Sequence, residues 1–208
     1  MLPLGEMLAV SSNVGFSKVF DRVGGARLDH WMRRFHFGVA PFEGAAFGAL
    51  PARVADKSYE GATVAIGQAV QATPLQMASI YATFANGGEY VAPTLVRRLD
   101  GAPPRERVVR ATTASAVVGM LAEVVNGEHG TGKRARVPGV PVAGKTGTAS
   151  WDRPGAPEGW YMSFIGIAPS DAPRWVVLVG VESPKGEGSG GTVAAPAFAR
   201  IVASALGR

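Results

Sequence analysis

The stretch GVPVAGKTGTAS, residues 139–150, matches two different kinds of site, and the choice between them decides the fold. Gly139 to Thr146 spell G-x-x-x-x-G-K-T, the loop whose backbone amides cradle phosphates in nucleotide-binding proteins. Residues 145–147 also form Lys-Thr-Gly. This second motif is typical of a binding site in which the lysine lies on a strand and not in a loop. The two readings make opposite demands on the flanking sequence.

The flanks do not fit a phosphate-binding loop. Such a loop needs a hydrophobic strand before it and a helix that begins near Lys145. The preceding residues, GKRARVP (132–138), are charged and turn-like, and Pro141 lies inside the would-be cradle. The residues that follow Gly147 include several that cannot continue a helix, namely Asp152, Pro154, Gly155 and Pro157. We therefore predict that this motif binds no nucleotide.

The flanks do fit a strand over residues 140–150. Gly147 has no side chain and would let a ligand approach the backbone closely. A strand of this kind can pair edge-on with an extended peptide while Lys145, Thr146 and Thr148 face it. The tripeptide alone is a weak signal, because three common residues recur by chance in many proteins.

The first part of the chain predicts helices. Apolar stripes, caps and glycine breaks place them at 4–10, 15–22, 28–35, 77–84 and 117–124. Thr73-Pro74-Leu75-Gln76 is a capping box with proline at the first helical position. Residues 38–61 are rich in glycine, proline and alanine without a clear period, so we expect a long irregular connection there.

The last third predicts strands. They are expected at 140–150, 162–168 and 175–182, followed by a glycine-rich loop at 186–191 and a C-terminal helix striped by Phe198, Ile201, Val202 and Ala205. The order indicates one α+β domain, an antiparallel sheet flanked by helices. We expect the helical part at about 1–130 and the strands with the closing helix at about 138–208, without a linker that divides the chain.

Composition excludes several functions. The net charge of +5 suggests nucleic acid, but the basic run at 133–136 has no aromatic residue beside it, so no nucleic-acid partner is expected. The three histidines (His30, His36 and His129) are too scattered for a metal site, and nothing indicates a cofactor. The longest apolar run, WVVLVGV (175–181), is too short to span a membrane. Residues 1–10 show no targeting segment.

Four segments, in order, resemble the second half of a penicillin-binding protein transpeptidase domain of the class B, monofunctional type. They are LAVSSNVGFSKVFDRVG (8–24), IGQAVQATPLQMASIYATFANGG (66–88), VAGKTGTAS (142–150) and GGTVAAPAF (190–198). The resemblance covers essentially the whole chain. It implies the penicillin-binding/serine β-lactamase-like fold, with a five-stranded antiparallel sheet between helical groups. It also implies an extracytoplasmic, membrane-anchored parent protein that cross-links peptidoglycan stem peptides and is acylated by β-lactams.

The same resemblance implies roles for single residues. Ser11 of the Ser-x-Asn motif would relay protons, and Lys145 would keep the site positive and assist that relay. The substrate would be bound by four residues, which are Asn13, Thr146, Gly147 and Thr148. The backbone N–H of Thr148 would be one oxyanion donor. Taken without the resemblance, Ser11 and Asn13 are better explained as helix caps.

One family motif is absent from the chain. The nucleophile of the family is the serine of Ser-x-x-Lys, upstream of Ser-x-Asn. No serine here has a lysine three residues later, and the nearest imitation is Ser150 with Arg153. We therefore expect a C-terminal portion of a transpeptidase domain, with the N-terminal part missing and no activity alone. The alternative is a non-catalytic peptide-binding or scaffold protein of the same fold. A β-lactamase or carboxypeptidase shares the motifs, but residues 73–88 favour a transpeptidase.

A missing N-terminal part has a structural consequence. In the family it supplies a central helix and a strand that completes the sheet. We therefore expect the 77–84 and 117–124 stripes to be uncovered and one sheet edge to be unpaired. The chain would then self-associate or pair with the missing half.

Overall fold

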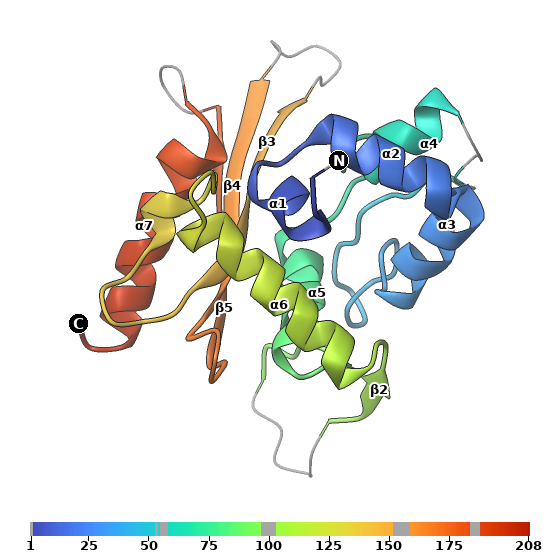
Figure 1. Cartoon of the computed structure of the whole chain (residues 1–208). Coiled ribbons are helices and arrows are strands. Elements are labelled where there is room, and N and C mark those ends of the chain that lie inside the picture. The colour runs from blue at the N-terminus through green and yellow to red at the C-terminus, as the bar shows by residue number, and fades with distance from the viewer. Residues whose placement is uncertain (1, 53, 55–57, 97–102, 152–158, 184–187) are drawn as a thin grey trace. The chain divides into compact units, whose positions relative to one another are not determined.

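The computed structural model describes residues 2–52, 54, 58–96, 103–151, 159–183 and 188–208 (Figure 1). The chain forms two compact units. One, here called the sheet unit, combines Met1–Ser11 with Ser115–Arg208, and the other, the helical unit, is Ser12–Ala114. The expectation of a single domain over residues 1–208 stays a prediction.

The sheet unit is built on an antiparallel meander. Its strands are β3 (Ala143–Trp151), β4 (Gly159–Ala168) and β5 (Trp175–Glu182), in the order β3-β4-β5. The long helix α7 (Gly190–Ala205) packs along the sheet (Figure 1). The three strands and the closing helix predicted from the sequence are confirmed. Residues 186 and 187 of the expected glycine-rich loop lie outside the described residues, and Gly190 and Gly191 already belong to α7.

The core of the sheet unit sits between the sheet and α7. Phe164 of β4 and Phe198 of α7 are fully buried and meet edge to face, with ring centroids 4.8 Å apart. Val142 and Val202 are buried in the same cluster. Gly144 passes so close to the Phe164 ring that an added Cβ would lie 2.5 Å from its Cζ. This close packing fixes the position of the β3 backbone at Gly144, and therefore also that of the next residue, Lys145.

Shorter elements complete the sheet unit. They are α1 (Leu4–Ala9), the part of α6 (Ala111–Asn126) from Ser115 onward, and the 3-10 turn η1 (Lys133–Ala135). The apolar stripe at 117–124 marks only the part of α6 whose spacing was visible in the sequence. Among the described helices, none combines the length and the apolar character needed to cross a membrane.

The helical unit contains every other predicted helix. Its elements are α2 (Asn13–Val23), α3 (Gly25–Arg34), α4 (Tyr59–Ala65), α5 (Pro74–Ala85), β1 (Glu89–Val91) and β2 (Arg105–Arg107). Helix α4 and the β1–β2 pair were missed. Helix α4 is only seven residues long and begins inside the stretch expected to be irregular, with its start marked by Ser58, whose side chain accepts from the Gly61 N–H. Strands of three residues are too short to show an alternating pattern.

The capping box at α5 is confirmed and extends beyond the helix. The Thr73 hydroxyl accepts from the Gln76 N–H at 3.2 Å, and Gln76 Oε1 accepts from the Thr73 N–H at 3.0 Å. The buried Gln76 side chain also accepts from the Gly48 N–H and donates to the Val39 carbonyl. One side chain therefore ties two points of the irregular 38–50 stretch to the start of α5.

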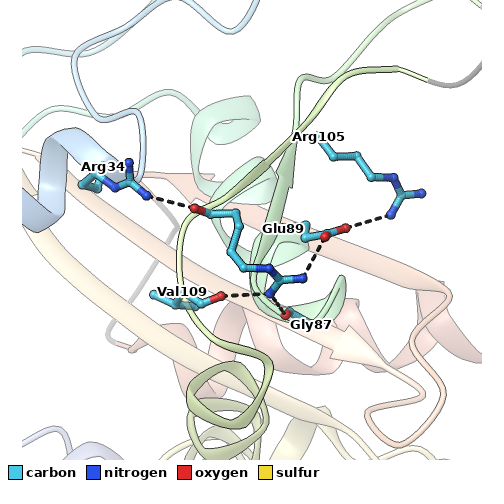
Figure 2. Close-up of polar contacts among 6 residues, drawn as sticks. Arg34, Gly87, Glu89, Arg105 and Val109 are labelled. Carbon is cyan, nitrogen blue, oxygen red and sulfur yellow. Dashed lines mark hydrogen bonds and ion pairs between the residues drawn. The ribbon is translucent and has the colours of Figure 1, made fainter.

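A single arginine organises the β1–β2 hairpin. Arg107 Nη1 donates to the carbonyls of Gly87 and Val109, and its Nη2 contacts Glu89 at 2.7 Å (Figure 2). Arg34 in turn donates to the Arg107 carbonyl at 2.9 Å. Isolated exposed ion pairs contribute little. Here one guanidinium joins two backbone carbonyls and the Glu89 carboxylate, which holds the ends of the β1–β2 pair together.

The expectation that two apolar stripes would be uncovered is wrong for half of their residues. Ile80 and Tyr81 of α5 are buried, and so are Leu121 and Val124 of α6. The other stripe residues are half-buried; they are Met77, Phe84, Val117 and Met120. The expected unpaired sheet edge is present, because among the described strands β5 pairs only with β4.

Candidate functional site

Two of the predicted site residues are in direct contact. Lys145 lies on β3, and its Nζ donates to Ser11 Oγ at 2.8 Å although 134 positions separate the two residues. Both residues belong to the sheet unit. The sequence-based expectation that this serine and this lysine meet is therefore matched by the geometry, while their roles stay a proposal.

Ser11 reaches Lys145 because the chain turns sharply after α1. The helix ends at Ala9, and the Ser11 N–H still donates to the Leu8 carbonyl at 3.2 Å. Ser11 itself adopts a left-handed backbone conformation, with φ of 55°. A residue other than glycine pays of order 1 kcal/mol or more for this conformation. The turn exposes Ser11 beside β3 and starts the next helix two residues later.

Burial tunes the lysine. The Lys145 side chain is partly buried, and the loss of hydration lowers the pKa of its ammonium group to about 8. Its Nζ also donates to the Thr146 carbonyl at 3.0 Å. A group with a pKa near the working pH can give or take a proton at little cost. At pH 7 Lys145 is mostly a cation, and above pH 8 it is mostly a neutral amine.

The lowered pKa predicts how stability depends on pH. The unfolded chain keeps this proton up to the ordinary value of 10.5 and the folded chain only up to about 8. The unfolded state thus binds more protons in this window, so the free energy of unfolding rises with pH across it. We expect Lys145→Met to remove roughly 2 kcal/mol of the rise between pH 7.5 and pH 9.5. Urea unfolding of the unaltered and the Lys145→Met chain at both pH values measures how much the free energy of unfolding rises in each. The contributions of all other titratable groups cancel when the two rises are subtracted. An identical rise in the two chains would contradict it.

Thr148 lies where α7 begins. Its Oγ1 accepts from the Gly190 N–H at 3.0 Å. A Cβ on Gly190 would overlap the carbonyl oxygens of Ser163 and Gly147, so only glycine allows α7 to start this close to β3. The N-terminus of a helix carries partial positive charge. This end of α7 and Lys145 together favour an anionic ligand along β3.

Asn13 is the first residue of α2, in the helical unit, and is exposed. The cap of this helix is Ser12, whose hydroxyl accepts from the Gly15 N–H at 3.0 Å. The explanation of Ser11 and Asn13 as helix caps is thus wrong for α2, because its cap is the serine between them. The binding role of Asn13 stays a prediction.

Sequence reasoning missed Thr131. Its Oγ1 lies 3.0 Å from Thr146 Oγ1 and 3.2 Å from the Ala9 carbonyl oxygen. The only signal in the sequence is a glycine on each side. A Cβ at Gly132 would lie 2.9 Å from the Phe164 ring, and one at Gly130 would overlap the Val124 carbonyl oxygen. Such tight packing marks a segment whose position is fixed.

The nucleotide-binding alternative fails on the same geometry. Lys145 sits inside β3, opposite Ile165 of β4, where a phosphate-binding loop would begin a helix. The residues after Trp151 that entered the sequence argument lie outside the described residues. We expect no saturable binding of ATP at micromolar concentration by isothermal titration calorimetry. Binding that Lys145→Ala abolishes would overturn the strand reading.

Comparison with known proteins gives a consistent result. The profile of the family described as "Penicillin binding protein transpeptidase domain" matches residues 1–203. Penicillin-binding protein PbpB of Mycolicibacterium smegmatis is 34% identical over 221 residues, which covers 95% of this chain and 34% of that protein. Peptidoglycan D,D-transpeptidase FtsI of Escherichia coli is 34% identical over 214 residues, covering 99% of this chain and 36% of that protein.

A solved structure shows the same fold. The crystal structure of penicillin binding protein 3 from Mycobacterium tuberculosis, complexed with aztreonam, matches with a TM-score of 0.85 at 34% identity. The match covers 99% of this chain and 51% of that one. The chain spans about a third of the length of the curated relatives it matches.

Proposed function

Because this chain belongs to the penicillin-binding protein transpeptidase family, we propose that it forms part of a peptidoglycan D,D-transpeptidase. It would bind the D-alanyl end of a stem peptide, or a β-lactam, along β3. The observation that carries the proposal is the 2.8 Å contact between Lys145 Nζ and Ser11 Oγ. Two groups that exchange protons in a transpeptidase must lie within hydrogen-bonding distance.

The chemistry of this pair is proton transfer. While Lys145 is charged, it donates to Ser11, and the hydroxyl proton of Ser11 can be passed to the leaving amine. In the same step Ser11 takes a proton from Lys145, which becomes a neutral amine at little cost because burial has lowered its pKa to about 8. Relay through a hydroxyl needs no charge on Ser11 at any stage.

The remaining groups bind and stabilise. The hydroxyl of Thr148 and the charge of Lys145 would hold the substrate carboxylate, with Thr146 between them on β3. The N–H of Thr148 would stabilise the oxyanion, a contribution of about 3 kcal/mol where such donors have been removed in other enzymes. Asn13 would bind the peptide amide, and Gly147 would let the substrate backbone approach.

The acylated serine lies on another segment in this proposal. The chain has no Ser-x-x-Lys, and its relatives are about three times as long. The whole reaction therefore needs a helix that carries this motif ahead of the Ser11 turn. By its family, the complete protein would work outside the cytoplasm with a membrane anchor.

A hybrid protein tests the proposal. Residues 1–208 are joined to the preceding segment of the Mycobacterium tuberculosis relative, which would supply the Ser-x-x-Lys helix. We expect the hybrid to be labelled by a fluorescent penicillin in a gel assay. Lys145→Ala in the hybrid should slow acylation at least about a hundredfold, because the amine that serves the proton relay is lost.

Two controls make the hybrid decisive. Lys133→Ala removes an exposed lysine of the same unit and should leave the labelling rate unchanged. A folded hybrid that is never labelled, but binds a D-alanyl-D-alanine peptide, would favour the non-catalytic binding protein instead. A Lys145→Ala hybrid labelled at the normal rate would contradict the role given to this lysine.

We also propose that the purified chain self-associates through β5. This strand reads WVVLVGVE, yet none of its residues is buried, and its outer edge lacks a partner among the described strands. Unpaired apolar edges are templates for further strands. Light scattering should show a mass above 21.5 kDa at micromolar concentration. Leu178→Lys should lower the mass towards the monomer, whereas Leu95→Lys, at a position 82% exposed in the helical unit, should not. A monomeric unaltered chain would refute association.

A further inference from the structure

Thr131 joins the end of α1 to β3 at the level of the site. Its backbone N–H and its hydroxyl both point at the Ala9 carbonyl oxygen, at 3.1 and 3.2 Å. The same hydroxyl oxygen lies 3.0 Å from Thr146 Oγ1. Ala9 is the last residue of α1, two positions before Ser11. Thr131 thus contacts the backbone that leads to Ser11 and the residue that follows Lys145.

The proton of each hydroxyl can be assigned from its neighbours. A carbonyl oxygen only accepts, and a threonine hydroxyl has one proton to donate. If Thr131 gave its proton to Thr146, the Thr131 hydroxyl oxygen and the Ala9 carbonyl oxygen would face each other with no hydroxyl proton between them. Every contact is satisfied only when Thr131 donates to Ala9 and Thr146 donates to Thr131.

The direction of the Thr146 hydroxyl then sets what Lys145 encounters. With its proton committed to Thr131, Thr146 Oγ1 can offer only lone pairs to the Lys145 ammonium, which lies 3.5 Å away. A hydroxyl free to rotate would at times point its proton at the ammonium, which repels it. The donors therefore run in one line, from Lys145 to Thr146 to Thr131 to Ala9.

We propose that Thr131 is a positioning residue of this site: its hydroxyl fixes the direction of the Thr146 hydroxyl and so keeps the Lys145 ammonium facing Ser11. The proposal rests on the proposed function for the meaning of the site. It also gives the two threonines of β3, Thr146 and Thr148, different roles. The Thr148 hydroxyl accepts from the Gly190 N–H and can give its proton to a ligand carboxylate, whereas the Thr146 proton is already committed.

The titration of Lys145 tests the proposal without any turnover. The 208-residue chain is prepared with 13Cε-labelled lysine, and the Lys145 signal is identified as the one that Lys145→Arg removes. In Thr131→Val the backbone bond to Ala9 remains but the hydroxyl is lost. We expect the titration midpoint of Lys145 to fall by roughly 0.3 to 0.5 pH units, the effect of weakening one hydrogen bond to the charged form of the lysine. Thr131→Ser should restore it to within about 0.1.

A double-mutant cycle separates positioning from general loosening. Thr146→Val should lower the midpoint by a similar amount, and Thr131→Val should add nothing further in that background, since Thr131 acts through Thr146. An unchanged midpoint in Thr131→Val, or additive effects, would overturn the proposal. A Thr131→Val chain that fails to fold would overturn it as well, because the main role of the hydroxyl would then be to hold α1 to β3 through Ala9. None of these results depends on penicillin labelling, so failure of the proposed function would show separately, in the hybrid.

Discussion

Incubated with a fluorescent penicillin under native conditions, the 208-residue chain is expected to form no stable adduct. A serine becomes a nucleophile when a neighbouring base takes its proton. Lys145 is the group beside Ser11, and with a pKa of about 8 it is a cation in roughly nine molecules of ten at pH 7. A cationic lysine donates to the hydroxyl instead of accepting from it. The exposed Ser11 should therefore relay protons and remain unacylated.

The pH dependence gives this prediction its sharpest check. If Ser11 were a nucleophile with Lys145 as its base, labelling would grow as pH rises from 7 to 9, because the neutral amine becomes the main form. A labelled band that grows in this way and disappears in Ser11→Ala would refute the relay assignment. Denatured chain serves as the background control, and the hybrid with a Ser-x-x-Lys segment is the positive control.

Gly190→Ala is expected to destabilise the sheet unit by at least about 3 kcal/mol, an effect at the upper end for one added methyl group. The new Cβ would overlap the carbonyl oxygens of Ser163 and Gly147 and lie 3.0 Å from the Gly147 N. These are backbone atoms of two paired strands, which cannot move aside as a flexible side chain can. The start of α7 must then withdraw from β3, and the 3.0 Å bond from Gly190 N to Thr148 is lost.

Gly119→Ala is the matched control. Gly119 lies on the exposed side of α6, where an added Cβ meets nothing within 4 Å. Alanine in a helix interior should raise stability by about 0.5–1 kcal/mol relative to glycine. Chemical denaturation monitored by circular dichroism compares the two variants. A Gly190→Ala chain as stable as the unaltered one would show that α7 does not begin against β3.

Local patterns in the sequence were enough for the longer elements. The Thr73–Gln76 capping box and the proline beside it specify where α5 begins, because those atoms are close in sequence and need no distant partner. The apolar run from Trp175 to Val181 specifies β5 in the same way. The three-residue strands β1 and β2 carry no such pattern, and Arg107 holds them through backbone groups that the sequence does not identify.

The choice between the two motifs in residues 139–150 was also made by the sequence. Charged residues before Gly139 and proline at 141 deny the phosphate-binding loop its strand and helix, whereas the whole pattern of four segments indicates a transpeptidase. Residue types alone therefore determined the family, the strand that carries Lys145, and the absence of the Ser-x-x-Lys motif.

Tertiary structure alone decided what the site residues do to one another. The lysine is tuned by burial, and burial depends on elements that are far apart in the chain. Thr131 entered the site because its hydroxyl meets Thr146 and Ala9 in space, 15 and 122 positions away. The hydrogen-bond partners of a hydroxyl depend on which groups lie near it in space, and the sequence does not show this. Neither its partners nor the direction of its proton could therefore be known before the chain had folded.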